Sequence, residues 1–321
     1  MFEAARETDA ILVVRLGAMG DILHALPAAT SLKLSFPQRK LAWVVDPLWV
    51  PLLSCNPYID RLIPFDPRHT SAWLAFWRTL RAWQYSVAVD FQGLTKSALV
   101  ARLAGSRRVF GFTGSEVRER PADLLYTDKV SSGAVHRVDR ALDLAAAAGA
   151  TVLTKESPLP RGEPEGQLPD APFVLASPFA GWGSKQWPIE YFDQLGAILR
   201  REAGLQLVLN AAPSSRDALA SVRNAWPHFS GIAGLIDATR RATSVIGVDS
   251  GPLHLAAALR KPGVAIFGPT DPAINGPYGG TFHVLRASDA PISYAREASI
   301  APSMRQITPQ QVWTALQPQH V

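Results

Sequence analysis

The residues best suited to chemistry lie in glycine-containing segments that each follow a run of apolar residues. The first segment, RLGAMGD (15–21), completes ILVVRL (11–16), a run typical of a buried parallel strand. Gly17 and Gly20 permit a tight turn and a close approach of a ligand to the backbone. Asp21 lies just before the helix predicted at 22–35, where it can cap the helix or act as a general base at the strand's carboxyl end. The sequence leaves both roles open.

A second segment, WGSKQWP (182–188), follows a strand predicted at 173–177 and precedes a predicted helix. Gly181 and Gly183 flank its bend. Lys185 is a candidate clamp for a diphosphate, because a lysine in a glycine-containing loop before a helix can meet a phosphate there. The alternative is an ordinary surface lysine.

A third segment, IGVDSGPLH (246–254), again ends a strand and opens a helix. Asp249 and Ser250 can cap this helix, and Gly251 exposes backbone amides. Such a terminus offers amides and a positive dipole to a phosphate group. His254 lies on the first turn, either toward the ligand or as a packing residue.

A fourth segment, FGPTDP (267–272), ends the next strand and is either part of the same site or a plain turn. No cluster of His, Cys and carboxylate residues has the spacing of a metal site, so we predict no protein-held metal.

Basic residues are concentrated between positions 61 and 120, which hold ten Lys or Arg and four Asp or Glu. The whole chain carries a net charge of +5 and has a pI of about 9.5. A local basic excess favours an anionic partner such as phosphorylated lipid, nucleic acid or a membrane surface, with a solvated basic face as the alternative. The predicted helix 71–83 is aromatic and basic. Its apolar residues recur at helical spacing (Trp73, Phe76, Trp77 and Leu80), so this face is either packed in the core or in contact with a membrane.

The composition is typical of a soluble folded protein, with 47% hydrophobic and 18% charged residues in 321 and a mean hydropathy of +0.05. No stretch of about 20 uncharged apolar residues occurs, and the N-terminal residues lack the pattern of a signal peptide. We therefore expect neither a membrane span nor a secretion signal. Cys55 is the only cysteine, which suits a reducing cytoplasm.

Strand and helix patterns alternate along the whole chain, which predicts parallel α/β sheets with right-handed crossovers. Residues 155–172 contain five prolines and no hydrophobic periodicity, as in a linker. We therefore predict domains at 1–160 and 161–307. We expect a final helix within 308–321 to pack back on the N-terminal domain.

Taken together and in order, these segments resemble family 9 glycosyltransferases, the lipopolysaccharide heptosyltransferases. The similarity runs from about residue 10 to 285 and is carried by RLGAMGDILHALPA, WVVDP, DFQGLTKSAL, KQWP, GVDSGPLHLAAAL and FGPTDP. The most similar type adds the first heptose to Kdo of the inner core. The resemblance implies a GT-B fold, with two Rossmann-like domains whose parallel sheets face a central cleft. It also implies inverting, metal-independent transfer from ADP-heptose to the Kdo/lipid A inner core, with no cofactor.

The resemblance further implies roles for individual residues. Asp21 matches the family's base, and Arg118 matches an arginine that binds the acceptor phosphate, with Arg140 as a further basic position. The acceptor surface predicted on the N-terminal domain comprises Gly20, Arg68, Arg118, Arg120 and Arg140. The donor set predicted on the C-terminal domain comprises Gly181, Lys185, Asp249, Ser250, Gly251 and His254. The rival interpretation of Arg118 is a structural pair with Glu116 or Glu119.

Some positions depart from the family pattern. Where the family often has a Glu that contacts the donor ribose, either Ser215 or Asp217 takes its place. Trp182 is bulky for a phosphate loop, and 286–306 matches none of the family's motifs. The alternatives are therefore a family 9 transferase with another nucleotide sugar or acceptor, or a non-catalytic nucleotide- or lipid-headgroup-binding relative. A nicotinamide oxidoreductase would need G-x-G-x-x-G, which 15–21 lacks.

The expected partners are a nucleotide sugar, an anionic lipid-linked saccharide and the inner face of the cytoplasmic membrane, where the enzyme would be peripheral. We expect a cytoplasmic monomer that binds no nucleic acid.

Overall fold

The structure is a computed structural model that describes residues 7–69 and 73–316. The chain forms two compact units, Met1–Pro160 and Arg161–Val321. Within the described residues, no helix is long and apolar enough to cross a membrane.

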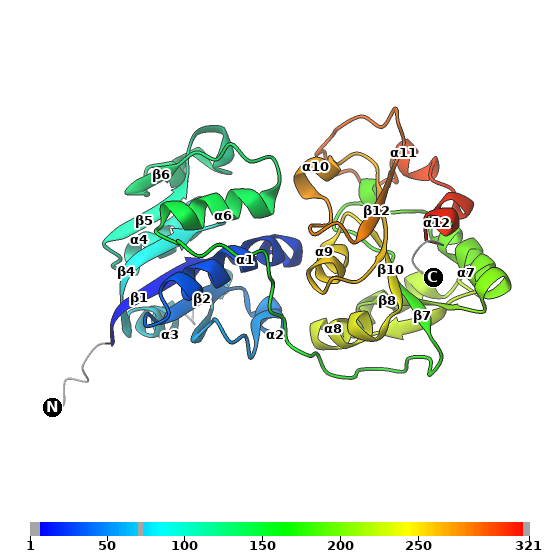
Figure 1. The fold of residues 1–321 in the computed structure, drawn as a ribbon, viewed down its shortest axis with the longest axis horizontal. Helices are drawn as coiled ribbons and strands as arrows, with labels where there is room; N and C mark the ends of the chain where they lie inside the picture. The colour runs from blue at the N-terminus through cyan, green and yellow to red at the C-terminus, as the bar shows by residue number, and fades with distance from the viewer. Residues whose placement is uncertain (1–6, 70–72, 317–321) are drawn as a thin grey trace. The chain divides into compact units, whose positions relative to one another are not determined.

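The first unit is a six-stranded parallel sheet in the order β3-β2-β1-β4-β5-β6 (Figure 1). Its strands are β1 (Glu7–Val14), β2 (Leu41–Val45), β3 (Arg61–Pro64), β4 (Trp83–Asp90), β5 (Arg108–Phe112) and β6 (Asp128–Val130). Its helices are α1 (Met19–Ser35), α2 (Val50–Leu53), α3 (Trp73–Leu80), α4 (Thr95–Leu103), α5 (Arg120–Asp123) and α6 (Arg137–Ala147). Helices α1 and α6 pack side by side in front of the sheet.

The second unit repeats this order, as β12-β11-β10-β7-β8-β9. Its strands are β7 (Phe173–Ser177), β8 (Gln206–Ala211), β9 (Trp226–Phe229), β10 (Ser244–Val248), β11 (Gly263–Phe267) and β12 (Phe282–Arg286). Its α-helices are α7 (Ile189–Ala203), α8 (Ile232–Arg241), α9 (Gly251–Ala258), α10 (Pro272–Asn275), α11 (Pro302–Arg305) and α12 (Pro309–Leu316).

The strand order places a topological switch point in each sheet. In the first sheet β1 and β4 are neighbours whose chains leave in opposite directions, and β7 and β10 have the same relation in the second. Ligands of open α/β sheets bind outside the carboxyl ends of strands at such points. Strands β2, β7, β10 and β11 are buried along their whole length, as expected for strands covered on both faces.

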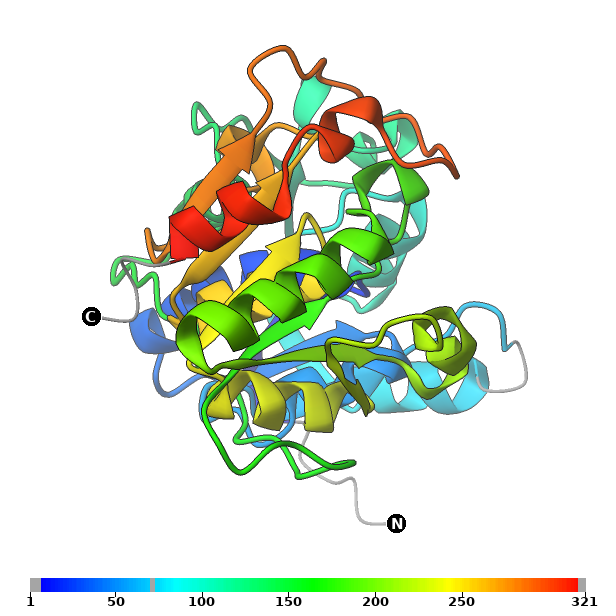
Figure 2. The same cartoon turned by 90° about the vertical axis from the view of Figure 1, so that its right-hand side faces the viewer.

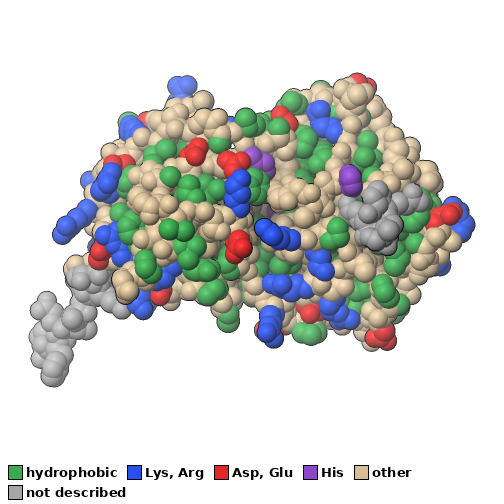
Figure 3. Space-filling model, in the orientation of Figure 1, with side chains coloured by type: hydrophobic (Ala, Val, Ile, Leu, Met, Phe, Trp, Pro, Cys, Tyr) green, Lys and Arg blue, Asp and Glu red, His purple; other side chains and the backbone are tan. Residues whose placement is uncertain are grey.

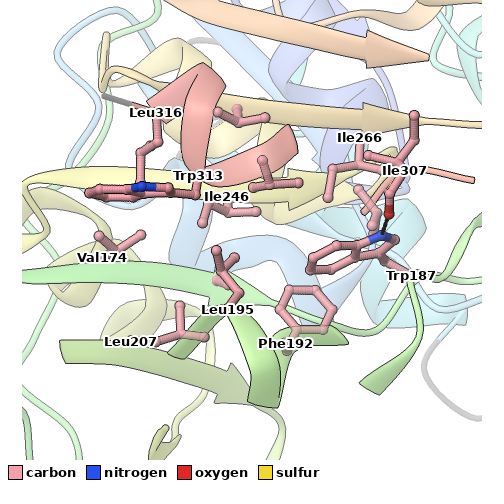
Figure 4. Close-up of a cluster of buried hydrophobic side chains, with 14 of the residues drawn as sticks. Val174, Trp187, Phe192, Leu195, Leu207, Ile246, Ile266, Ile307, Trp313 and Leu316 are labelled. Carbon is pink, nitrogen blue, oxygen red and sulfur yellow. Dashed lines mark hydrogen bonds between the residues drawn. The ribbon is translucent and has the colours of Figure 1, made fainter. Parts of the chain in front are cut away.

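The last helix packs into the core of the second unit. Helix α12 packs against α7, β11 and β12 of the second unit (Figure 2). Its Val312, Trp313 and Leu316 are buried in the core of the second unit, near Val174 and Ile246 (Figure 4). Just before α12, the Ile307 carbonyl accepts a hydrogen bond of 2.8 Å from Trp187 Nε1. The apolar face of α12 is thus satisfied within its own unit, and residues 317–321 lie outside the described part of the chain.

Other boundaries also differ from the predictions. The helix predicted at 71–83 covers Trp73–Leu80, and residues 70–72 lie outside the described part. Residues 214–225, whose sequence pattern predicts a helix, instead contain a 3-10 segment, Pro213–Leu219, and strand β9 follows at Trp226–Phe229. The sequence patterns did not identify α8, β6 or β12.

Candidate active site

Asp21 lies at the switch point of the first sheet, on the first turn of α1. The N-cap residue of this helix is Ala18, so Asp21 does not occupy the capping position. Its carboxylate instead faces three guanidinium groups. Oδ2 contacts Arg15 and lies 3.5 Å from Arg118 Nη2, and Oδ1 lies 3.7 Å from Arg137 Nη1. One carboxylate therefore faces three positively charged groups.

Arg15, which contacts Asp21, is held in place by burial and by hydrogen bonds. It is buried, its Nη1 donates a 2.5 Å hydrogen bond to the Phe91 carbonyl, and its own carbonyl accepts one of 3.0 Å from Trp43 Nε1. The next backbone amide, that of Leu16, donates to Gln92 Oε1 at 2.6 Å. The end of β1 is therefore tied to the loop after β4, which fixes the guanidinium that Asp21 meets.

Asp90, the first residue of the DFQG motif (90–93), has a structural role. One carboxylate oxygen accepts from the amide of Gln92 at 2.8 Å, and the other accepts from Ser97 Oγ at 2.8 Å and the Tyr126 hydroxyl at 2.7 Å. Burial raises the pKa of Asp90 despite these hydrogen bonds. The side chain is fully buried and shapes the loop that holds Arg15.

Opposing effects set the charge of Asp21. Burial alone would raise the pKa of its carboxyl group, because the charged form loses hydration. The neighbouring charges of Arg15, Arg118 and Arg137 outweigh burial and hold the pKa well below its ordinary range. Asp21 is therefore a carboxylate at neutral pH.

A pocket of about 550 Å³, its open side included, surrounds this carboxylate. It brings together two groups predicted from the sequence, Arg118 and Arg140, with Asp21. It also contains Glu116, named in the sequence only as a possible partner of Arg118, and four polar residues that were not proposed as site residues: Arg15, His24, Gln92 and Arg137. The ring of His24 meets that of His136 edge-on at 5.6 Å.

Three residues predicted for the acceptor surface do not line this pocket: Gly20, Arg68 and Arg120. Gly20 precedes Asp21 in α1. Arg68 instead forms a two-point ion pair with Asp66, in which Nε lies 2.8 Å from Oδ1 and Nη2 lies 2.9 Å from Oδ2. Arg120 is exposed at the start of α5.

The rival pairing of Arg118 with an adjacent glutamate is not what the structure has. Glu116 accepts from the Ser132 amide at 2.7 Å, and Glu119 accepts from the Thr95 amide and hydroxyl at 2.8 and 2.6 Å. Arg118 faces Asp21 instead.

Lys185 marks a second site, at the switch point of the second sheet. Its Nζ donates to Asp249 Oδ2 at 2.8 Å and to the Asp249 carbonyl at 3.1 Å. His254 Nε2 lies 3.5 Å from the other carboxylate oxygen. An ammonium has three donors, so Lys185 is anchored by two with one available for a ligand. Burial would raise the pKa of Asp249, but His254 and Lys185 hold it below its ordinary range.

Trp182 packs against this lysine. Lys185 Nζ lies 4.4 Å from the centre of one Trp182 ring, and the guanidinium carbon of Arg296 lies 5.5 Å from it. The bulky residue that departs from the family pattern thus forms cation–π contacts with two basic groups.

The segment 286–306, which carries none of the family motifs identified in the sequence, supports the same loop. The Ser184 amide donates to the Glu297 carbonyl at 3.1 Å, and a Cβ on Gly183 would lie 1.7 Å from the Ala298 carbonyl oxygen. Only glycine fits at 183, because the backbone of the later segment passes directly over it. The segment therefore fixes the position of Lys185.

The start of α9 completes the second site. Ser250 is the N-cap residue in extended conformation, yet its side chain makes no capping bond. Its Oγ is buried and has no hydrogen-bond partner among the described residues, and the same holds for Thr270 Oγ1 in the FGPTDP segment. Gly251 begins the helix directly after Ser250, and Gly181, in the loop after β7, is exposed with open space around it. The start of α9 therefore offers amide and hydroxyl donors for a phosphate group.

Two doubly wound parallel sheets with these sites define an α/β protein of the GT-B class, which confirms the predicted fold class. The profile of glycosyltransferase family 9 (heptosyltransferase) matches residues 73–299. Lipopolysaccharide heptosyltransferase 1 of Pseudomonas aeruginosa and that of Escherichia coli K12 are each 30% identical over 307 residues. These alignments cover 88% and 86% of this chain and 84% and 93% of those proteins. The chain belongs to glycosyltransferase family 9.

Solved structures agree with this assignment. E. coli heptosyltransferase WaaC with ADP matches with a TM-score of 0.76 and 26% identity, over 97% of this chain and 99% of that one. A family 9 glycosyltransferase from Veillonella parvula matches with a TM-score of 0.81 and 19% identity, over 98% and 97%, which supports the fold alone.

Proposed function

We propose that this protein transfers heptose from ADP-heptose to the Kdo/lipid A inner core of lipopolysaccharide, with inversion and without a metal ion. The observation that carries the proposal is the Asp21 carboxylate in an arginine-lined pocket at the switch point of the first sheet. Support comes from relatives named lipopolysaccharide heptosyltransferase 1 and from the structure of WaaC with ADP-2-deoxy-2-fluoro heptose.

In the proposed reaction, Asp21 takes the proton of the acceptor hydroxyl. The hydroxyl oxygen forms a bond to the anomeric carbon of the donor, and the bond from that carbon to the diphosphate oxygen breaks. The electron pair leaves on the diphosphate and yields ADP. Lys185, the Gly251 amide and the Ser250 hydroxyl belong to the unit that binds the donor, where they stabilise this developing negative charge.

The direct test is transfer of heptose from ADP-heptose to Kdo-lipid A by the purified protein, followed by mass spectrometry of the product. A thermal-shift screen against ADP-, UDP- and GDP-sugars accompanies it, with the largest shift expected for the ADP-sugar. A shift with another nucleotide alone would favour a different donor. Donor binding without transfer would favour a non-catalytic relative.

Removal of divalent metal is expected to leave transfer unchanged. Among the described residues no group of three or more His, Cys, Asp or Glu side chains could hold a metal ion. Lys185 and the start of α9 supply the positive potential that a metal supplies in other transferases. Initial rates with EDTA, and after re-addition of Mg²⁺ or Mn²⁺, check this. Loss of activity that the metals restore would contradict it.

We further propose that the protein is a cytoplasmic monomer that binds peripherally to the inner face of the cytoplasmic membrane. The supporting feature is the α3–α4 face, the outer side of residues 73–107. It exposes Leu74 (63%), Leu99 (44%) and Leu103 (38%). It also exposes five cations: Arg78, Arg81, Lys96, Arg102 and Arg107. Within 73–107 the only acidic residue is the buried Asp90, and one exposed acid from outside this range, Glu119, bonds Thr95 at the start of α4.

Arg81 connects the two helices of this face, because its Nε and Nη2 donate to the Leu103 carbonyl at 3.3 and 3.2 Å. Leucines among cations suit a surface of anionic lipid. On the face of the first unit drawn in Figure 3, by contrast, acidic side chains lie among the basic ones.

The double variant Arg78→Gln/Arg102→Gln should therefore bind vesicles containing anionic phospholipid roughly 30-fold more weakly, at about 1 kcal/mol for each cation removed. Vesicle co-sedimentation measures this, and transfer to a soluble, deacylated acceptor should be retained. The matched control is Arg200→Gln/Arg201→Gln, which removes two exposed cations from α7 of the second unit. Equal loss in both variants would contradict the assignment of the α3–α4 face.

A further inference from the structure

The three guanidinium groups around Asp21 differ in their exposure and in their distance from its carboxylate. The Arg15 side chain is 5% exposed and tied to the Phe91 carbonyl. The side chains of Arg118 and Arg137 are 41% and 36% exposed, and they reach Asp21 from separate elements, the loop before α5 and the first turn of α6. Arg15 is therefore a buried partner of Asp21, whereas Arg118 and Arg137 are solvent-accessible partners.

The two exposed partners are also the more distant ones. Their nitrogens lie 3.5 and 3.7 Å from the carboxylate oxygens, whereas charge-assisted hydrogen bonds have lengths of about 2.7–2.9 Å. Pairs of this length are held by charge more than by directed hydrogen bonds. The planar guanidinium group can pair with a new carboxylate or phosphate in a forked geometry.

We propose that Arg118 and Arg137 are exchangeable partners of Asp21: they pair with it in the empty site and pass to an anionic group of the acceptor when the acceptor binds. Asp21 is then left with Arg15 and with the acceptor hydroxyl. The proposal rests on the function proposed above. It makes Arg137 a positioning residue, and it makes the charge of the acceptor a requirement for turnover as well as for binding.

The physical reason is the conflict between a stable carboxylate and an effective base. A carboxylate that faces three cations has a low proton affinity, and a general base works best when its pKa lies nearer the working pH. Transfer of two cations to an anion removes much of their effect, and burial and the nearby anion then raise the pKa of Asp21. An acceptor without the anion would leave the base suppressed.

Other charged or titratable groups face this carboxylate as well. His24 lies on the next turn of α1 and lowers the pKa of Asp21 in the same sense as the arginines, and His136 packs on its ring. Glu116 and Arg140 line the same pocket. Arg140 is held differently, since its Nε donates to the Ala134 carbonyl at 2.8 Å and it forms no ion pair with Asp21 among the described residues. It is therefore the matched control.

The test compares three acceptors: Kdo-lipid A, the same molecule with its sugar carboxylate reduced to an alcohol, and a dephosphorylated form. For the wild type, we expect removal of the exchanging anion to lower kcat by roughly 10-fold or more, in addition to raising KM. The acceptor that shows this loss identifies whether carboxylate or phosphate takes the arginines. A loss confined to KM for both altered acceptors would overturn the proposal.

The Arg137→Gln variant tests the proposal more directly, because it should have opposite effects with the intact and the altered acceptor. It should raise KM for the intact acceptor but increase kcat for the altered one by roughly three- to tenfold, because one cation that suppresses the base is gone. Arg140→Gln should raise KM without that gain. If Arg137→Gln lowered kcat equally with both acceptors, while thermal unfolding showed a folded protein, Arg137 would have no exchanging role.

A pH profile gives an independent measurement. In the wild type, the acidic limb of kcat, which reports the acceptor complex, should lie at higher pH than the limb of kcat/KM for the acceptor, which reports the donor-bound enzyme without it. In Arg137→Gln the two limbs should approach each other. Coincident limbs in the wild type would overturn the exchange. No transfer to intact Kdo-lipid A by the wild type would instead refute the proposed function.

Discussion

Asp21→Asn should lower kcat by roughly 10²–10⁴, the usual contribution of a positioned general base. The amide has the shape of the carboxylate but cannot take the acceptor proton at neutral pH. Donor binding should be retained, because the residues predicted for the donor lie in the second unit. Initial rates at saturating donor and acceptor, together with donor binding by calorimetry, measure the two effects separately.

The structure adds a condition to this experiment. Arg15 is buried and contacts Asp21, so the amide leaves a buried cation without its anionic partner. Loss of one member of a buried pair is destabilising by about 3–5 kcal/mol at the upper limit. Rates should therefore be compared well below the unfolding temperature of the variant.

Asp128→Asn is a suitable control, since Asp128 pairs with Arg108 on the surface of the same unit, away from the pocket. It should leave kcat unchanged. Near-normal turnover of folded Asp21→Asn would remove Asp21 from the role of base.

The sequence was informative where the signal is local. Each of Asp21, Lys185 and Asp249 lies a few residues after an apolar run, and parallel strands necessarily present their carboxyl ends at one edge of a sheet. The same alternation of strand and helix predicts the two parallel sheets. The repeated strand order then follows from short connections and right-handed crossovers.

The residues that the sequence did not reveal depend on contacts between distant positions. Arg137 is more than 100 residues from Asp21, and nothing in its neighbourhood indicates that it faces a carboxylate. Arg15 stands within an apolar run, and its partner at the Phe91 carbonyl is 76 residues away. Arg68 is the opposite case, because Asp66 competes for it two residues earlier in the chain.

Two strands that the sequence patterns did not identify were missed for different physical reasons. Strand β12 is only partly buried at the sheet edge, so it lacks the continuous apolar run of a central strand. Strand β6 has three residues, too few for a periodic pattern. The sequence does predict a final helix, but the surface on which α12 packs is a tertiary property, since its apolar stripe fits any exposed apolar surface.

The second large effect is expected at the donor site, where Lys185→Met should lower kcat by roughly 10²–10³ and weaken donor binding. Lys185 is held by Asp249 with one donor left for the diphosphate. Asp249→Asn should cause a similar loss of kcat because it releases the anchor. If the two residues act as a unit, the double variant should lose little more than either single variant.

Stability distinguishes this pair from a surface contact. The side chains of Lys185 and Asp249 are 15% and 7% exposed, so Lys185→Met leaves a buried carboxylate with His254 alone and should cost about 3–5 kcal/mol at neutral pH. The pKa of Asp249 is depressed in the native protein, so its contribution to stability is present above the ordinary pKa of an aspartate and is lost as the pH falls. The difference in unfolding free energy between wild type and variant should therefore shrink toward acidic pH.

Lys261→Met is the matched control for both measurements. Lys261 is a partly buried lysine of the same unit whose Nζ donates to the Ala242 carbonyl at 2.7 Å, and burial lowers its pKa. Its replacement should leave kcat and donor affinity unchanged, because it pairs with no group of the donor site. Wild-type kcat in folded Lys185→Met would exclude Lys185 from stabilising the leaving diphosphate. A loss shared equally by Lys261→Met would show that the effect is structural.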